Sequence, residues 1–132
     1  MQTSKPSIRQ RVAQPKILVV EDNEDNLVYI TYALALFKYH YLVTQNAHEG
    51  LFLAQEYQPD LIILDIKMPQ ISGIDLIKML RSQDKLSQTP VVAVTALATE
   101  SEKELIFNAG FNGYLVKPYF LDDLKQTICS CI

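Results

Sequence analysis

The sequence has little of what would tie the protein to a membrane, a thiolate metal site or nucleic acid. Its 132 residues contain only two cysteines, Cys129 and Cys131. Their spacing does not share a helix face, so neither a structural zinc site nor a facile disulfide follows. No apolar run approaches the length needed to cross a bilayer. The net charge of −3 gives no basic excess for nucleic acid or an anionic membrane. These absences predict a soluble protein of a reducing, cytoplasmic compartment.

Acidic residues are also missing from positions 1–20, which contain four basic residues together with Pro6 and Pro15. This polar stretch has no continuous apolar segment, which excludes a secretory signal. We therefore expect residues 1–15 to form a disordered basic leader and residues 16–132 to form one folded domain, with no output domain attached.

Five segments rich in branched apolar residues alternate with segments of helical periodicity. The predicted strands are Lys16–Glu21, Tyr41–Thr44, Leu61–Leu64, Val91–Thr95 and Tyr114–Val116. Asn23 and Asn46 are predicted to cap the first two helices, and Gly110 to end the fourth. Strands separated by helical patterns of this length imply parallel βαβ units with right-handed crossovers, which together form one doubly wound α/β domain.

Charged side chains follow three of the predicted strands. Glu21 and Asp22 come at the end of the first strand, Asp65 follows the third, and Lys117 follows the fifth. If the three strands are parallel neighbours, three carboxylates and one ammonium meet at the carboxyl edge of the sheet, where open α/β sheets bind ligands. Hard oxygen ligands with one lysine suit a magnesium ion and a phosphoryl group.

These motifs resemble the receiver domain of two-component response regulators, of the chemotaxis-regulator type, over about residues 15–130. The residues that carry the resemblance are Glu21-Asp22, Asp65 with Lys67-Met68-Pro69, Thr95-Ala96, Ala109-Gly110 and the run from Tyr114 to Pro118. Each motif alone is weak, but all of them in this order at strand ends form a strong signal. The resemblance implies a flavodoxin-like fold, with a five-stranded parallel sheet in the order 2-1-3-4-5 flanked by five helices.

The resemblance also implies a role for each acidic residue. Asp65 would be the nucleophile that takes a phosphoryl group from a phosphohistidine and becomes an aspartyl phosphate. Asp22 would bind Mg²⁺ directly, Glu21 would reach it through water, and the backbone carbonyl of Lys67 would be a further protein ligand. The ion would offset the repulsion between the carboxylate and the incoming phosphoryl group.

The remaining motif residues would form a switch. In the family that the motifs resemble, Lys117 would pair with a phosphoryl oxygen, and the Thr95 hydroxyl would donate a hydrogen bond to the phosphoryl group. Movement of Thr95 would let Tyr114 swing inward, and the peptide bond before Pro118 would be cis.

The same resemblance implies partners rather than a substrate in the ordinary sense. A sensor histidine kinase or a phosphotransfer protein would be the phosphodonor. An unknown downstream protein would read the surface of the fourth helix, the fifth strand and the fifth helix. The protein would be a signalling switch and not an enzyme, because it would catalyse only its own phosphorylation and slow autodephosphorylation.

The sequence departs from the family pattern in its acidic pair, which is Glu-Asp instead of Asp-Asp. The longer Glu21 side chain changes only the outer contact to the ion. Lys67 and Leu97 lie two residues after Asp65 and Thr95, at positions that in the family tune how water reaches the phosphoryl group. We therefore expect both side chains to affect the phosphoryl lifetime.

Three other functions remain open at this point. A phosphatase-type hydrolase with an aspartate nucleophile would carry a second aspartate two residues after Asp65, where Lys67 stands. A flavin-binding protein of similar fold would carry a Ser/Thr/Gly-rich phosphate loop after the first strand, and the sequence has none there. A receiver that takes no phosphate and acts as a scaffold is disfavoured, because the acceptor, the acidic pair and the lysine are all present.

Overall fold

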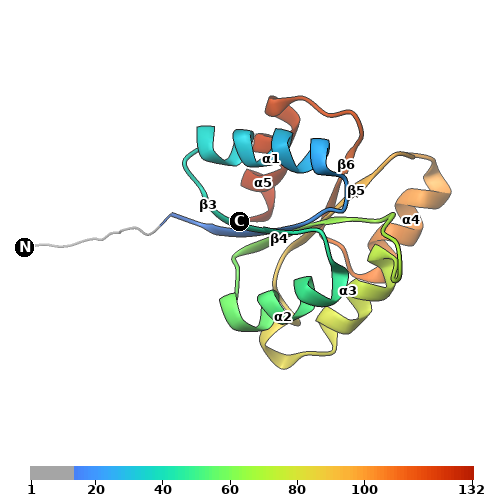
Figure 1. Cartoon of the computed structure of the whole chain (residues 1–132). Coiled ribbons are helices and arrows are strands. Elements are labelled where there is room, and N and C mark those ends of the chain that lie inside the picture. The colour runs from blue at the N-terminus through green and yellow to red at the C-terminus, as the bar shows by residue number, and fades with distance from the viewer. Residues whose placement is uncertain (1–13) are drawn as a thin grey trace, which may run out of the picture.

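Residues 14–132 are described by a computed structural model in which one parallel sheet lies between two layers of helices (Figure 1). Helices α1 and α5 cover one face of the sheet, and α2, α3 and α4 cover the other (Figure 1). The predicted leader falls mostly on residues 1–13, which lie outside the described residues. Its disorder, and the division of the chain at residue 16, stay predictions.

The strands lie in the order that the sequence predicts. They are β2 (Lys16–Val20), β3 (His40–Thr44), β4 (Leu61–Asp65), β5 (Val91–Thr95) and β6 (Gly113–Val116). Their order across the sheet is β3-β2-β4-β5-β6, and every neighbouring pair is parallel. Counted along the described chain this is 2-1-3-4-5, so the predicted fold class is confirmed. The winding reverses between β2 and β4, which creates a crevice at their carboxyl ends.

The helices begin and end where local chemistry favours it. They are α1 (Glu24–Leu36), α2 (Ala47–Tyr57), α3 (Gly73–Arg81), α4 (Glu100–Ala109) and α5 (Leu121–Cys131). The predicted caps are confirmed: the Asn23 and Asn46 side chains accept hydrogen bonds from backbone N–H groups three residues on, each at 2.9 Å. Gly110 ends α4 in the left-handed conformation, with φ of 114°.

Four strand termini differ from the prediction by one residue: β3 and β6 begin one residue earlier, and β2 and β4 differ at their carboxyl ends. The differences at the carboxyl ends bear on the site. β2 ends at Val20, because the ladder with β3 stops at the pair Val20 and Thr44. Glu21 still donates its backbone N–H to the Thr44 carbonyl at 3.0 Å, but its side chain is free to turn toward the sheet edge. β4 extends to Asp65, which pairs with Val94 of β5. Asp65 is therefore held by the sheet itself.

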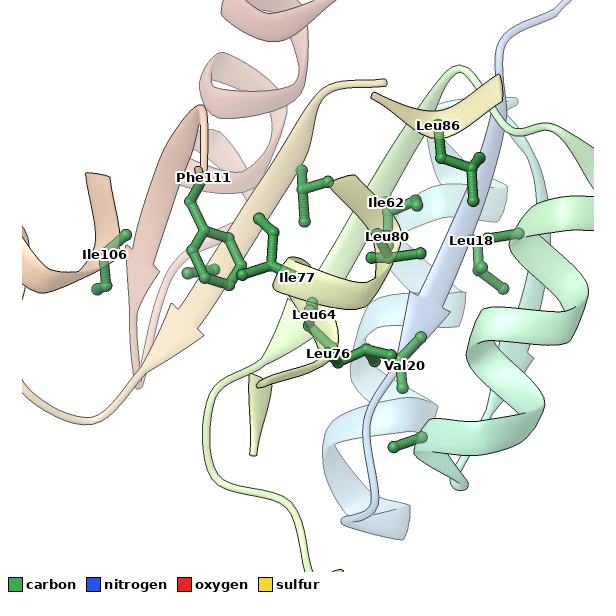
Figure 2. Close-up of a cluster of buried hydrophobic side chains, with 14 residues drawn as sticks. Leu18, Val20, Ile62, Leu64, Leu76, Ile77, Leu80, Leu86, Ile106 and Phe111 are labelled. Atoms are coloured by element: carbon green, nitrogen blue, oxygen red, sulfur yellow. The ribbon is translucent and has the colours of Figure 1, made fainter. Parts of the chain in front are cut away.

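Apolar side chains form one buried cluster on each face of the sheet, and β4 supplies both. Ile62 and Leu64 belong to the cluster under α2, α3 and α4, where Leu76 and Leu80 of α3 pack beside them (Figure 2). Ile63 belongs to the cluster under α1 and α5. Each fully buried side chain of this size contributes about 1.5–3 kcal/mol. The core therefore fixes the backbone on which Asp65 sits.

A short 3₁₀ turn, η1 (Asp84–Leu86), lies between α3 and β5 and was not predicted. It buries Leu86 against the larger cluster. Across residues 14–132, the helices are too short or too polar for any of them to span a membrane.

Candidate functional site

The sequence-predicted residues meet at the carboxyl edge of the sheet. Glu21 and Asp22 follow β2, Asp65 ends β4, Thr95 ends β5 and Lys117 follows β6. Because β2, β4, β5 and β6 are consecutive and parallel, their carboxyl ends lie along one edge. The site is thus a consequence of strand order, since its members are far apart in sequence.

Three carboxylates form the acidic part of the site. One oxygen from each of Glu21, Asp22 and Asp65 lies within 4.8 Å of the others. Glu21 and Asp65 are buried and Asp22 is half-buried. Burial, followed by the hydrogen bond and the charge of Asp65, raises the pKa of Glu21 to about 7, against the opposing effects of the Asn23 N–H and Lys117. The cluster therefore resists carrying its full negative charge.

Lys117 supplies the positive charge of the site. Its Nζ atom lies 3.2 Å from Oδ2 of Asp65 and 3.5 Å from Oε1 of Glu21. The peptide bond between Lys117 and Pro118 is cis, as the resemblance predicts. One ammonium therefore lies close to two buried carboxylates, and the cluster of three acids and one lysine has more negative than positive groups.

The backbone after β4 holds the Asp65 carboxylate in place. The N–H of Lys67 donates to Oδ1 of Asp65 at 3.1 Å, while the Lys67 side chain is exposed. Gly73, the first residue of α3, donates its N–H to the Ile66 carbonyl at 2.8 Å. A Cβ atom at Gly73 would lie 2.7 Å from the Asp65 carbonyl oxygen, so only glycine allows this close approach.

Thr95 and Tyr114 lie on the side of α4. The buried Thr95 hydroxyl accepts a hydrogen bond from the Leu97 N–H at 3.1 Å. Tyr114 is half-buried, with its ring edge-on to Phe107 at 5.9 Å between centroids. The Nζ atom of Lys103 lies 5.8 Å from the centre of the same ring. Tyr114 therefore contacts α4 itself, whereas Thr95 contacts the loop that leads from β5 to α4.

Asp65 lines one cavity, and Lys117 lines both that cavity and a wider one. The first, of about 130 Å³, is lined by Asp65, Thr95 and Lys117, by the residues that follow β4 and β5, and by Glu102 of α4. The wider one, of about 580 Å³, has Lys117 but not Asp65 in its lining. It is lined by Tyr29 and Tyr119, and the Tyr29 hydroxyl donates to the Tyr119 carbonyl at 3.0 Å. Sequence reasoning missed Glu102, Tyr29 and Tyr119. The places of Glu102 and Tyr29 depend on where α4 and α1 begin, and Tyr119 lies in the loop between β6 and α5.

The carboxylate cluster fits a hard divalent cation. Magnesium prefers oxygen ligands and keeps several waters, so two or three carboxylates at one open edge are a suitable set. The raised pKa of Glu21 also favours a cation site, because a bound cation would reduce the repulsion between ionised Glu21 and Asp65.

Comparison with known proteins agrees with this arrangement. A family model described as the response regulator receiver domain matches residues 17–129. This chain belongs to that family. The polar-differentiation response regulator DivK of Brucella anthropi is 38% identical over 114 residues, which cover 86% of this chain and 93% of DivK. The resemblance noted in the motifs is therefore confirmed, and the chain is a receiver domain of two-component signalling.

Solved structures of receiver domains are equally similar in fold. The chemotaxis protein CheY4 of Vibrio cholerae has a TM-score of 0.87 and 28% identity, covering 91% of this chain and 100% of CheY4. The receiver domain of a Pseudomonas aeruginosa sensor histidine kinase has a TM-score of 0.83 and 28% identity, covering 89% and 97% of the two chains. That structure is described with a magnesium ion coordinated in its active-site cleft.

Proposed function

We propose that this receiver domain is a magnesium-dependent phosphoacceptor switch in which Asp65 takes a phosphoryl group from a phosphohistidine. The observation that carries the proposal is the position of Asp65. Its carboxylate is buried at the end of β4, beside the two other acids and 3.2 Å from the ammonium of Lys117. A carboxylate placed in this way is a nucleophile with its own cationic partner at hand.

The transfer needs only one bond to form and one to break at phosphorus. An Asp65 oxygen attacks the phosphorus, the bond from phosphorus to the imidazole nitrogen breaks, and the electron pair leaves with the imidazole. The Lys67 N–H holds one carboxylate oxygen, so the other is oriented for attack. Lys117 pairs with an oxygen of the transferred group and offsets part of its charge.

Asp22, Asp65 and Glu21 would hold the magnesium ion, with the Lys67 carbonyl as a further ligand. The bound ion supplies charge neutralisation between the carboxylate and the phosphoryl oxygens. The Thr95 hydroxyl accepts from the Leu97 N–H and keeps its own hydrogen to donate to the phosphoryl group, and movement of Thr95 toward that group would make room for Tyr114. Lys67 and Leu97 flank the acceptor cavity and set how readily water reaches the aspartyl phosphate.

The switch would have two protein partners. A sensor histidine kinase or a phosphotransfer protein supplies the phosphoryl group. A downstream protein reads the surface formed by α4, β6 and α5, because Tyr114 lies on β6 and contacts α4. The chain would work in the cytoplasm as a switch, with its own dephosphorylation as a slow side reaction.

Intact mass after incubation with acetyl phosphate and magnesium tests the proposal. Wild-type protein should gain the mass of one phosphoryl group, and Asp65→Asn protein should not. Chelation of magnesium should also prevent the gain. Asp60→Asn is the matched control, since Asp60 lies at the opposite end of β4 and its carboxylate accepts from the Lys16 N–H. Folded wild-type protein that gains no mass would exclude the acceptor role.

A further inference from the structure

A glutamate of α4 faces the same small cavity as the phosphoacceptor. Every other residue around this cavity lies at or just after the end of β4, β5 or β6, whereas Glu102 is the third residue of α4. Glu102 is half-buried and, apart from Asp65, supplies the only carboxylate of the lining.

Within residues 14–132, no lysine, arginine or histidine forms an ion pair with Glu102. Lys103, the next residue, pairs with Glu100 at 3.6 Å. Lys117 and Lys67 also line the cavity, but Lys117 is shared between Asp65 and Glu21 and the Lys67 side chain is exposed. Glu102 therefore has no ion-pair partner among the described residues, and a second anion in the cavity would feel its charge.

The first turn of α4 also keeps Glu102 where it is. The Thr99 hydroxyl caps the helix by accepting a hydrogen bond from the Glu102 N–H at 3.1 Å. The positive end of the helix further favours an acidic residue at this position. A capped helix start gives the glutamate backbone a fixed place beside the cavity, so its charge acts from a defined direction.

We propose that Glu102 is an electrostatic gate of the acceptor cavity, whose charge opposes a phosphoryl group arriving at Asp65 and so slows loading by anionic phosphodonors. The inference rests on the proposed function, because it needs a phosphoryl group at Asp65. It assigns to α4 a direct part in phosphoryl transfer, acting through charge alone.

Loading rates of two isosteric variants test the gate. Glu102→Gln removes the charge at the cavity, and Glu104→Gln removes the same charge from an exposed position of the same helix. The rate of phosphoryl gain from acetyl phosphate, at saturating magnesium and low salt, should rise about two- to fivefold in Glu102→Gln, as expected for one partly exposed charge interaction. It should stay near the wild-type rate in Glu104→Gln.

Salt and a second variant separate charge from structure. The advantage of Glu102→Gln should shrink at about 0.5 M salt, because screening weakens interactions between partly exposed charges. Glu102→Lys should load faster than Glu102→Gln, whereas a purely steric role would give no ranking by charge. Circular dichroism checks that each variant keeps the fold. If Glu102→Gln is misfolded, the labelling rate of Glu102→Lys is compared with that of the wild-type protein instead.

Each outcome separates the gate from the acceptor role. If Glu102→Gln is labelled at the same rate as Glu104→Gln, or more slowly, the gate is overturned. Labelling of the wild-type protein in the same experiment would leave the acceptor role intact. No label in either protein overturns the proposed function and the gate together, with Asp65→Asn as the blank.

Discussion

The ammonium of Lys117 lies 3.2 Å from Oδ2 of Asp65, although 52 residues separate the two in the sequence. The same ammonium lies 3.5 Å from Glu21, and Asp22 completes a group of three acids. Three carboxylates against one lysine leave the described cluster with a negative excess. Binding of either a proton or a cation relieves that excess, so the stability of the domain should depend on both.

Metal-free protein should lose stability as the pH rises through the titration of Glu21. The pKa of Glu21 is raised from 4.5 to about 7, chiefly by burial, so the folded state holds a proton that the unfolded state releases. The contribution is present in full below pH 4.5 and is lost as the pH rises to about 7. Urea unfolding with chelator should show up to about 3 kcal/mol of this loss in wild type but not in Glu21→Gln. Parallel pH profiles of the two proteins would contradict this.

Magnesium should stabilise the folded domain through Asp22. A ligand at about one hundred times its Kd adds about 2.7 kcal/mol to the free energy of unfolding, so the Tm should rise with magnesium concentration. Asp22→Asn should abolish most of that rise. Asp25→Asn should keep it, because Asp25 is exposed in the first turn of α1 and lies outside the carboxylate cluster. Thermal unfolding at several magnesium concentrations makes the comparison, and an unchanged rise in Asp22→Asn would exclude Asp22 as a ligand.

Gly73→Ala should damage the acceptor although Gly73 carries no chemistry. The new methyl group would lie 2.7 Å from the Asp65 carbonyl oxygen and 2.8 Å from Cα of Ile66, so the backbone beneath the acceptor has to move. We expect a loss of about 1–3 kcal/mol of stability, as for other overpacked sites, and slower labelling of Asp65. Gly113→Ala is the control, because its nearest contact would be the Cys131 Sγ at 3.5 Å. Similar losses in both variants would show that the close approach at Gly73 is not the cause.

Arg81→Lys should destabilise the domain without touching the site. The Arg81 guanidinium donates to acceptors from three segments, namely the carbonyls of Leu86, Ser87, Thr89 and Gly110 and the side chain of Asn112. A lysine cannot reach this set, and each lost bond costs about 0.5–1.5 kcal/mol, so we expect a loss of about 2 kcal/mol or more. Urea unfolding should show no comparable loss in Lys78→Arg, since Lys78 is exposed on the same helix. An unaltered midpoint in Arg81→Lys would contradict the bridging role.

The acceptor cluster could be predicted from sequence because it depends on few choices. Apolar runs and helical periods fix which segments are strands, and parallel strands place their carboxyl ends on one edge. Once Asp65 and Lys117 are assigned to strand ends, their proximity follows from strand order. The one-residue errors at Glu21 and Asp65 did not change this, since both residues stay at the same edge.

Contacts that depend on helix position or on backbone carbonyls could not be predicted. Glu102 lines the cavity beside Asp65 only because Thr99 caps α4 and so fixes where the helix begins. The sequence of the polar first turn does not indicate which of its side chains faces the sheet. The partners of Arg81 are mainly main-chain oxygens of η1 and of the α4 end, which leave no signature in side-chain chemistry. The raised pKa of Glu21 likewise needs its burial to be known.

The strand order has a consequence for a chain that is still folding. β6 pairs only with β5 at the edge of the sheet, yet it positions the one ammonium that Asp65 and Glu21 share. Before β6 docks, the two acids lack the ammonium that they share in the folded domain. On the proposed function, the ability to take a phosphoryl group would therefore be a property of the complete sheet. The fraction of molecules that accept label would then measure the fraction in which β6 has docked.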